Sequence, residues 1–217
     1  MFRLLKSYYT IEKDGIVEIE IKKSRFICHL KRVATEAEAQ DYIQTLKKEH
    51  VKANHNCVAY LIGDHNEIQR AYDDGEPSGT AGVPMLEVLK KQELKNVVAV
   101  VTRYFGGTKL GAGGLIRAYG KAVSTALEEM GVVERKLQTE MKATVQYPAS
   151  GKLENDLRES AYRIKEILYT DQVTFVCFVD EAEINVFQKE VIDWTNGQVA
   201  FSKGEKSYHD LKRTPAQ

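Results

Sequence analysis

The sequence predicts an α+β protein with two domains, and three observations support this prediction. Short segments in which apolar and polar residues alternate, the period of half-buried strands, recur along the chain. A run of valines and alanines leads through a glycine-rich loop into a long amphipathic pattern, typical of a buried strand followed by a helix. In the last third of the chain, the patterns follow the order strand, helix, strand, strand, helix, strand.

The predicted first domain, residues 1–136, begins with a sheet. Within residues 16–21, Ile19 and Ile21 alternate with Glu18 and Glu20, and residues 25–33 continue as a second strand. Thr35 and Glu38 then form a T-x-x-E capping box, which predicts that a helix starts there.

The second half of this domain adds strands and two helices. Residues 56–63 and 67–73 predict a pair of strands, and residues 85–91 predict a short helix. Residues 96–105 contain five consecutive Val or Ala residues, which predicts a central strand. A long helix follows the loop at 106–114 because apolar residues recur at spacings of three and four. Its predicted buried face consists of Ile116, Tyr119, Val123, Leu127 and Met130.

The predicted second domain covers residues 137–203. Its βαββαβ order is that of the ferredoxin-like split motif. Ser150 is the predicted cap of its first helix, and the polar residues 204–217 are predicted to form a flexible tail. The predicted elements are a strand at 141–147, a helix at 151–161, strands at 163–169 and 172–179, a helix from about Asp180 to Trp194 and a strand at 198–202.

Charge and cysteine content limit the class of protein. Basic and acidic residues both number 31, which argues against a strongly basic nucleic-acid coat protein but leaves room for a local basic patch. Residues 1–136 carry 21 basic and 18 acidic side chains, which favours the first domain for anionic partners. Cys28, Cys57 and Cys177 are far apart, so we expect buried, reduced thiols in a cytoplasmic protein. Neither a signal peptide nor an apolar run that could span a membrane is expected.

The strongest functional feature is the strand, glycine-rich loop and helix unit. Glycine lets backbone N–H groups converge, and the helix N-terminus that follows favours an anion. The P-loop and dinucleotide fingerprints are both absent, so the alternative that these glycines serve only tight turns and close packing stays open. The predicted anion-binding residues are Arg103, Gly106, Gly107, Lys109, Gly111, Gly113, Gly114, Arg117 and Lys121.

A second feature is the acidic segment DDGEPSGTAGVP. Its carboxylates, Asp73, Asp74 and Glu76, are close enough in sequence to hold a divalent cation or to act in catalysis. Two alternatives stay open: the carboxylates pair with Arg103 or Arg117, or the segment is an ordinary polar turn. Ser78 and Thr80 would serve as nucleophiles only beside a base that the sequence does not place.

A third feature is the segment NHNC, which contains His55 and Cys57 and follows Cys28 and His29 in the sequence. The spacing of these residues is not that of a zinc site, so we expect no metal and no cofactor. His55 is expected either to be structural or to support the glycine-rich loop.

The motifs ANHNCVAY, DDGEPSGTAGVPML and VVTRYFGGTKLGAGGLIRAYGKA resemble the signature of the Impact family, in its bacterial two-domain YigZ/YvyE-type branch. This resemblance implies that the first domain has the fold of the second domain of small-subunit ribosomal protein five. It also implies that the second domain resembles the ferredoxin-like domains of elongation factor G. Eukaryotic relatives regulate translation initiation, but that activity also depends on an RWD domain, for which this sequence has no matching segment.

Three hypotheses for function follow. In the first, the protein binds RNA, the ribosome or a translation factor: the glycine-rich loop contacts phosphate, and Tyr104 or Phe105 stacks on a base. In the second, it is an enzyme for a small phosphorylated or carboxylated substrate, with Asp73, Asp74 and Glu76 as acid–base or metal groups. In the third, the same loops bind a protein partner. The sequence does not define an oligomeric state.

Overall fold

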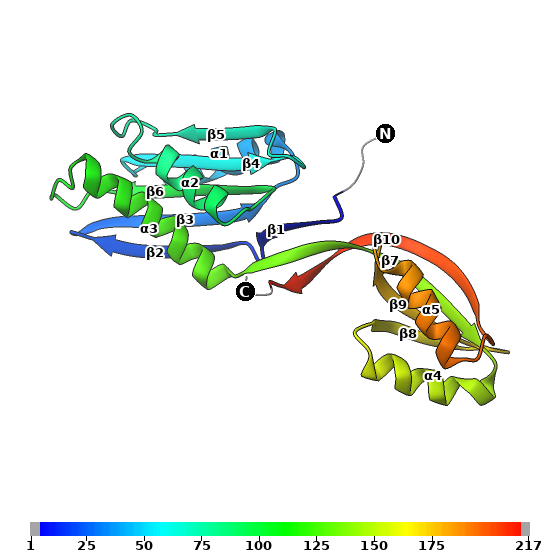
Figure 1. Ribbon diagram of the computed structural model, residues 1–217. Helices are drawn as coiled ribbons and strands as arrows, with labels where there is room; N and C mark the ends of the chain where they lie inside the picture. The colour runs from blue at the N-terminus through cyan, green and yellow to red at the C-terminus, as the bar shows by residue number, and fades with distance from the viewer. Residues whose placement is uncertain (1–4, 214–217) are drawn as a thin grey trace. The chain divides into compact units, whose positions relative to one another are not determined.

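The computed structural model describes residues 5–213. The chain divides into two compact units, and each is described by itself (Figure 1). The first unit is formed by Tyr8–Glu134 and takes up the chain again from Asp210 onward, and the second contains Arg135–His209. Both units combine antiparallel strands with helices, so the predicted α+β class is confirmed.

The first unit contains a five-stranded antiparallel sheet in the order β2-β3-β6-β4-β5. The run of valines and alanines forms β6, and β6 lies in the middle of the sheet as predicted. The strands are β2 (Gly15–Ile21), β3 (Ser24–Arg32), β4 (His55–Ile62), β5 (Ile68–Tyr72) and β6 (Val97–Tyr104).

Helices cover both faces of this sheet (Figure 1). One face packs against α1 (Glu36–Glu49), and the other against α2 (Gly82–Lys91) and α3 (Ala112–Met130). The predicted cap of α1 is confirmed, because the Thr35 side chain accepts a hydrogen bond from the Glu38 N–H at 3.2 Å. Successive residues of a strand point to opposite faces, so each strand contributes to both cores.

Helix α3 begins at Ala112, earlier than predicted, and therefore includes two glycines of the predicted loop. Its buried stripe contains Leu115 and Tyr119, whereas Ile116 is 44% exposed, so the prediction for Ile116 was wrong. The spacing pattern allowed either Leu115 or Ile116 to begin the stripe, and the packing of α3 on the sheet selects Leu115.

The second unit has the predicted βαββαβ order. Strand β7 pairs with β9 and β10, and β9 pairs with β8, which is the ferredoxin-like arrangement. A short strand that the sequence did not predict, β1 (Ser7–Ile11), also pairs with β7. The elements are β7 (Val132–Val145), α4 (Tyr147–Glu159), β8 (Arg163–Tyr169), β9 (Val173–Asp180), α5 (Ile184–Trp194) and β10 (Ala200–Lys212).

Two details of this unit differ from prediction. Helix α4 starts at Tyr147 with a proline in its first turn, and Ser150 donates a hydrogen bond to the Tyr147 carbonyl at 2.8 Å instead of capping the helix. Strand β10 continues to Lys212, so residues 204–212 are not a flexible tail, while residues 214–217 lie outside the described part. Pairing with the long strand β7 provides hydrogen-bond partners for the backbone of β10. A polar segment can therefore form this strand.

Candidate functional site

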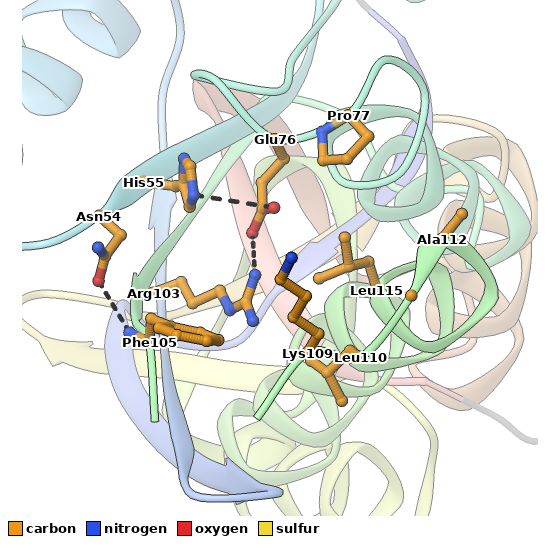
Figure 2. A pocket seen from close by; sticks show the side chains of 11 residues that line it. Asn54, His55, Glu76, Pro77, Arg103, Phe105, Lys109, Leu110, Ala112 and Leu115 are labelled. Atoms are coloured by element: carbon orange, nitrogen blue, oxygen red, sulfur yellow. Dashed lines mark hydrogen bonds and ion pairs between the residues drawn. The ribbon is translucent and has the colours of Figure 1, made fainter. Parts of the chain in front are cut away.

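A pocket of about 440 Å³ lies where β6 ends, between the acidic loop and the start of α3 (Figure 2). Both loops that the sequence analysis singled out contribute to it. Its lining residues are Asn54, His55, Glu76, Pro77, Arg103, Phe105, Lys109, Leu110, Gly111, Ala112 and Leu115.

The sheet register brings the polar residues of the pocket together. His55 on β4 and Phe26 on β3 lie directly opposite Arg103 on β6, one on each side. Because side chains alternate along strands, all three point to the face that carries α2 and α3. The Arg103 guanidinium lies 5.3 Å from the centre of the Phe26 ring and 5.6 Å from that of Phe105.

A buried ion pair forms the base of the pocket. The Arg103 Nη1 donates to Glu76 Oε1 at 2.6 Å, and Arg103 is only 5% exposed. The Tyr119 hydroxyl donates to the same oxygen at 2.7 Å, and Ser24 accepts a longer hydrogen bond of 3.4 Å from Arg103. Burying two charges is costly unless both are paired and hydrogen-bonded, and here several groups share that role.

Tyr119 and His55 have defined roles around Glu76. Burial raises the pKa of Tyr119 far above its usual value, and its hydrogen bond to Glu76 acts in the same direction, so Tyr119 remains a donor. His55 Nδ1 donates to the Asp74 carbonyl at 2.9 Å, because a carbonyl only accepts. In the neutral ring, His55 Nε2 is therefore an acceptor, and it lies 3.8 Å from Glu76 Oε2.

The N-terminus of α3 is open toward the pocket. In the part of the chain that the structure describes, no side chain caps the helix at Gly111. Gly111 has a φ of +70° and Gly107 a φ of +85°, a conformation that favours glycine at both positions. The first-turn N–H groups of a helix have no partner within the helix, and Gly111 and Ala112 line the pocket. Lys109 extends into it and makes no ion pair with any residue in the range 5–213 (Figure 2).

The three clustered carboxylates do not converge. Asp73 accepts hydrogen bonds from three backbone N–H groups at the start of α2, at 2.8, 3.1 and 2.9 Å. Asp74 accepts from Lys47 and from the Asn56 N–H, each at 2.7 Å. Burial raises the pKa of Asp74, but the two hydrogen bonds together with the nearby Lys47 and His55 lower it by more, so its pKa is below the usual value. Only Glu76 faces the pocket.

Other candidates lie away from the pocket. Arg117 and Lys121 line a separate hollow on the other side of Leu110, so the predicted anion-binding residues form two groups. The Tyr104 hydroxyl lies 3.0 Å from His50 Nδ1, on the α1 face of the sheet. Ser78 is exposed.

Further candidates serve the backbone of the two loops. Thr80 is buried and donates to the Pro77 carbonyl at 2.6 Å, within the acidic loop. Gly106 permits a close backbone approach to Lys23, since an added Cβ would lie 2.0 Å from the Lys23 carbonyl oxygen.

Sequence reasoning missed Ser24 and Phe26, which touch Arg103 from a strand distant in sequence. No local pattern indicated that contact. Among residues 5–213, no group of three His, Cys, Asp or Glu side chains could hold a metal ion. The three cysteines are buried and free as predicted, and burial raises the pKa of each thiol.

Fold and pocket together define a two-domain α+β protein whose first unit carries a glycine-rich loop at a helix N-terminus. The model of the Impact N-terminal domain matches residues 22–127, and that of a domain of unknown function, DUF1949, matches residues 144–198. The chain belongs to the IMPACT family, as the resemblance of its motifs implied. No helix in the described part of the chain is long and apolar enough to cross a membrane.

Relatives of similar length support this assignment. IMPACT family member YvyE of Bacillus subtilis is 58% identical over 94% of both chains. IMPACT family member YigZ of Escherichia coli is 34% identical over 83% of this chain and 89% of its own. A protein IMPACT homolog of Schizosaccharomyces pombe is 39% identical, but over only 42% of this chain and 33% of its own. The crystal structure of a hypothetical protein has a TM-score of 0.59 at 32% identity, covering 91% of this chain and 97% of its own.

Proposed function

We propose that this protein binds single-stranded RNA through the pocket at the start of α3. One phosphate lies against the first-turn N–H groups of α3 and the Lys109 ammonium, and the adjacent base stacks on Phe105. The observation that carries the proposal concerns one pocket, which is lined by a helix N-terminus, a lysine and a 46% exposed aromatic ring. Within residues 5–213, no side chain caps that helix and no carboxylate pairs with that lysine. Stacking of one base on an aromatic side chain contributes about 1–3 kcal/mol.

The buried ion pair of Glu76 and Arg103 helps to position the Phe105 ring. Because Glu76 already holds Arg103, Arg103 positions Phe105 through its cation–π contact instead of binding phosphate directly. Phe105 is also fixed by its backbone N–H, which donates to the Asn54 side chain at 2.8 Å. The natural target that the family resemblance implies is RNA of the ribosome or of a translation complex, where binding would regulate translation.

The proposal is tested by fluorescence anisotropy with a labelled single-stranded RNA of twelve uridines, titrated at several salt concentrations. Affinity should fall steeply as salt rises, because phosphate contacts release counterions. Lys109→Ala and Phe105→Leu should each weaken binding about tenfold. Lys48→Ala, which removes an exposed cation from α1, is the charge-matched control. Binding that is independent of salt, or equal in the Lys109 and Lys48 variants, would contradict the proposal.

A second candidate is acid–base catalysis on a small phosphorylated or carboxylated substrate, and one observation favours it. His55 Nε2 and Glu76 Oε2, 3.8 Å apart, both face the pocket, where a bound substrate could exchange a proton with either. Asp73 and Asp74 do not line the pocket, so this hypothesis now rests on Glu76 and His55. Turnover of a nucleotide or sugar phosphate can be followed by ³¹P NMR. Loss of turnover in His55→Gln, with RNA affinity unchanged, would support the enzyme hypothesis.

A further inference from the structure

A second hollow of about 310 Å³ lies beside the pocket, between the turn that joins β2 to β3 and helix α3. Its cations come from both elements: Lys22 from the turn, and Arg117 and Lys121 from one face of α3. None of these three side chains forms an ion pair with another described residue. Three like charges around one concave surface favour an anionic occupant.

The backbone fixes the position of Lys22. Lys22 and Lys23 have φ values of +48° and +66°, the left-handed conformation that two-residue hairpin turns usually assign to asparagine and glycine. The turn touches the glycine-rich loop at Gly106, where an added Cβ would lie 2.0 Å from the Lys23 carbonyl oxygen. Lys22 therefore lies beside α3 in a backbone conformation that is strained for lysine and that asparagine or glycine would adopt with less strain.

Leu110 separates this hollow from the pocket and lines both. Gly114 allows this placement, since an added Cβ there would lie 3.1 Å from the Leu110 Cβ. An extended RNA chain that leaves the pocket and crosses Leu110 would enter the hollow. The apolar Leu110 side chain would then face the sugar between two phosphates. Among the described residues, no acidic side chain lines the hollow.

We propose that this hollow binds a second phosphate of the same single-stranded RNA, so that the protein holds a step of two nucleotides across Leu110. This inference rests on the proposed function, because it requires the first phosphate at α3. It assigns Arg117 and Lys121 to the second phosphate and Lys109 to the first.

The test compares two probes with one set of variants. A uridine 12-mer spans both sites, whereas uridine 5′-monophosphate, followed by NMR chemical shifts, fills only the first. Arg117→Gln and Lys121→Gln should each weaken 12-mer binding several-fold, and together they should reduce the salt slope of log K by about 0.7, the value for one single-strand phosphate. Neither should change binding of the monophosphate, whereas Lys109→Ala should weaken both.

Two further variants separate binding from folding. Lys22→Asn suits the left-handed turn, so its thermal midpoint should equal or exceed that of the wild type while 12-mer affinity falls. Lys48→Ala should leave affinity for both probes unchanged. Wild-type 12-mer affinity and salt slope in the Arg117, Lys121 and Lys22 variants, with Lys109→Ala still weakened, would overturn the second site alone. Absence of RNA binding by the wild type would overturn both proposals, and competition by polyglutamate as strong as by RNA would overturn the assignment of a nucleotide ligand.

Discussion

The two faces of the five-stranded sheet carry different polar clusters. On the α2 and α3 face, Glu76 and Arg103 are charged, and each is hydrogen-bonded by its neighbours. On the α1 face, His29 is 2% exposed and neither ring nitrogen has a hydrogen-bond partner among the described residues. Burial is the main cause that lowers the pKa of His29 to about 4, and the nearby His50 contributes less. The sheet retains buried charge only where partners compensate it, and elsewhere the buried group is neutral.

The largest effect should come from removing the charge of Glu76. Glu76→Gln keeps the shape but leaves the Arg103 guanidinium buried without a counter-charge, which should cost about 3–5 kcal/mol in the free energy of unfolding. Urea denaturation at pH 7 measures this. Glu87→Gln, which breaks an exposed pair with Lys90 at 3.1 Å, is the control and should change stability by less than about 0.5 kcal/mol. Equal effects would mean that burial of the Glu76–Arg103 pair does not make its loss more costly than that of an exposed pair.

The neutral face should respond to acid. His29 has a folded-state pKa of about 4, below its ordinary value of 6.5, so the unfolded chain binds a proton first as pH falls. Its stability contribution is complete above pH 6.5 and is lost between pH 6.5 and 4, by about 3 kcal/mol. His29→Phe should lack this loss when unfolding is measured at pH 7, 5.5 and 4. The exposed His65→Gln should follow the wild type, and a His29 variant with unchanged acid sensitivity would show that another group is responsible.

A moderate effect is expected at the loop that carries Glu76. Asp73→Ala removes the acceptor for three N–H groups around the start of α2, which should cost about 1–2 kcal/mol. The freed amides of Gly79, Ala81 and Gly82 should exchange hydrogen faster. Asp41→Ala, an exposed position on α1, serves as the control and should leave that exchange unchanged. Unchanged exchange in the Asp73 variant would mean that the loop holds its shape by other contacts.

The smallest effect concerns the open helix end. Gly113 has neither a positive φ nor a close contact, since an added Cβ would meet only Arg117 Nη1 at 3.7 Å. Gly113→Ala should therefore raise stability by up to about 1 kcal/mol. It should also weaken RNA binding, because Gly113 is in the first turn of α3, whose N–H groups we assign to the phosphate. Gly151→Ala on α4, where an added Cβ would have no described atom within 4 Å, should give the same stability gain without a change in RNA affinity. Undiminished RNA binding by the Gly113 variant would place the phosphate elsewhere.

Local patterns predicted most of the fold. The strand at 163–169 appears with the same bounds, and the cap of α1 and the central position of β6 are confirmed. Two strands that the sequence did not predict, β1 and the extension of β10, depend on a distant partner. They are short or polar segments that become strands because β7 pairs with them. No local propensity carries that information.

The candidate site was also predictable only in part, because local patterns do not show which distant residues meet. Glycine content and the start of a helix indicated the glycine-rich loop. The sequence offered no basis for distinguishing the roles of Asp73, Asp74 and Glu76. Loop geometry turns the carboxylate of Asp73 onto its own backbone and leaves only Glu76 at the pocket. Similarly, the spacing of Arg117 and Lys121 indicated a shared face of α3 without indicating which face, and the packing of Tyr119 directs them to the second hollow.

The return of the chain to the first unit at Asp210 has a consequence for biosynthesis. Arg32 donates to Asp210 at 2.7 Å and Arg213 donates to Gln92 at 3.0 Å, so residues that are translated after the second unit complete the first unit. During synthesis, the first unit therefore lacks these partners until the ribosome has translated the second unit and reached Arg213. A fragment that stops before Asp210 should mature more slowly and be degraded by proteases more readily than the full-length chain.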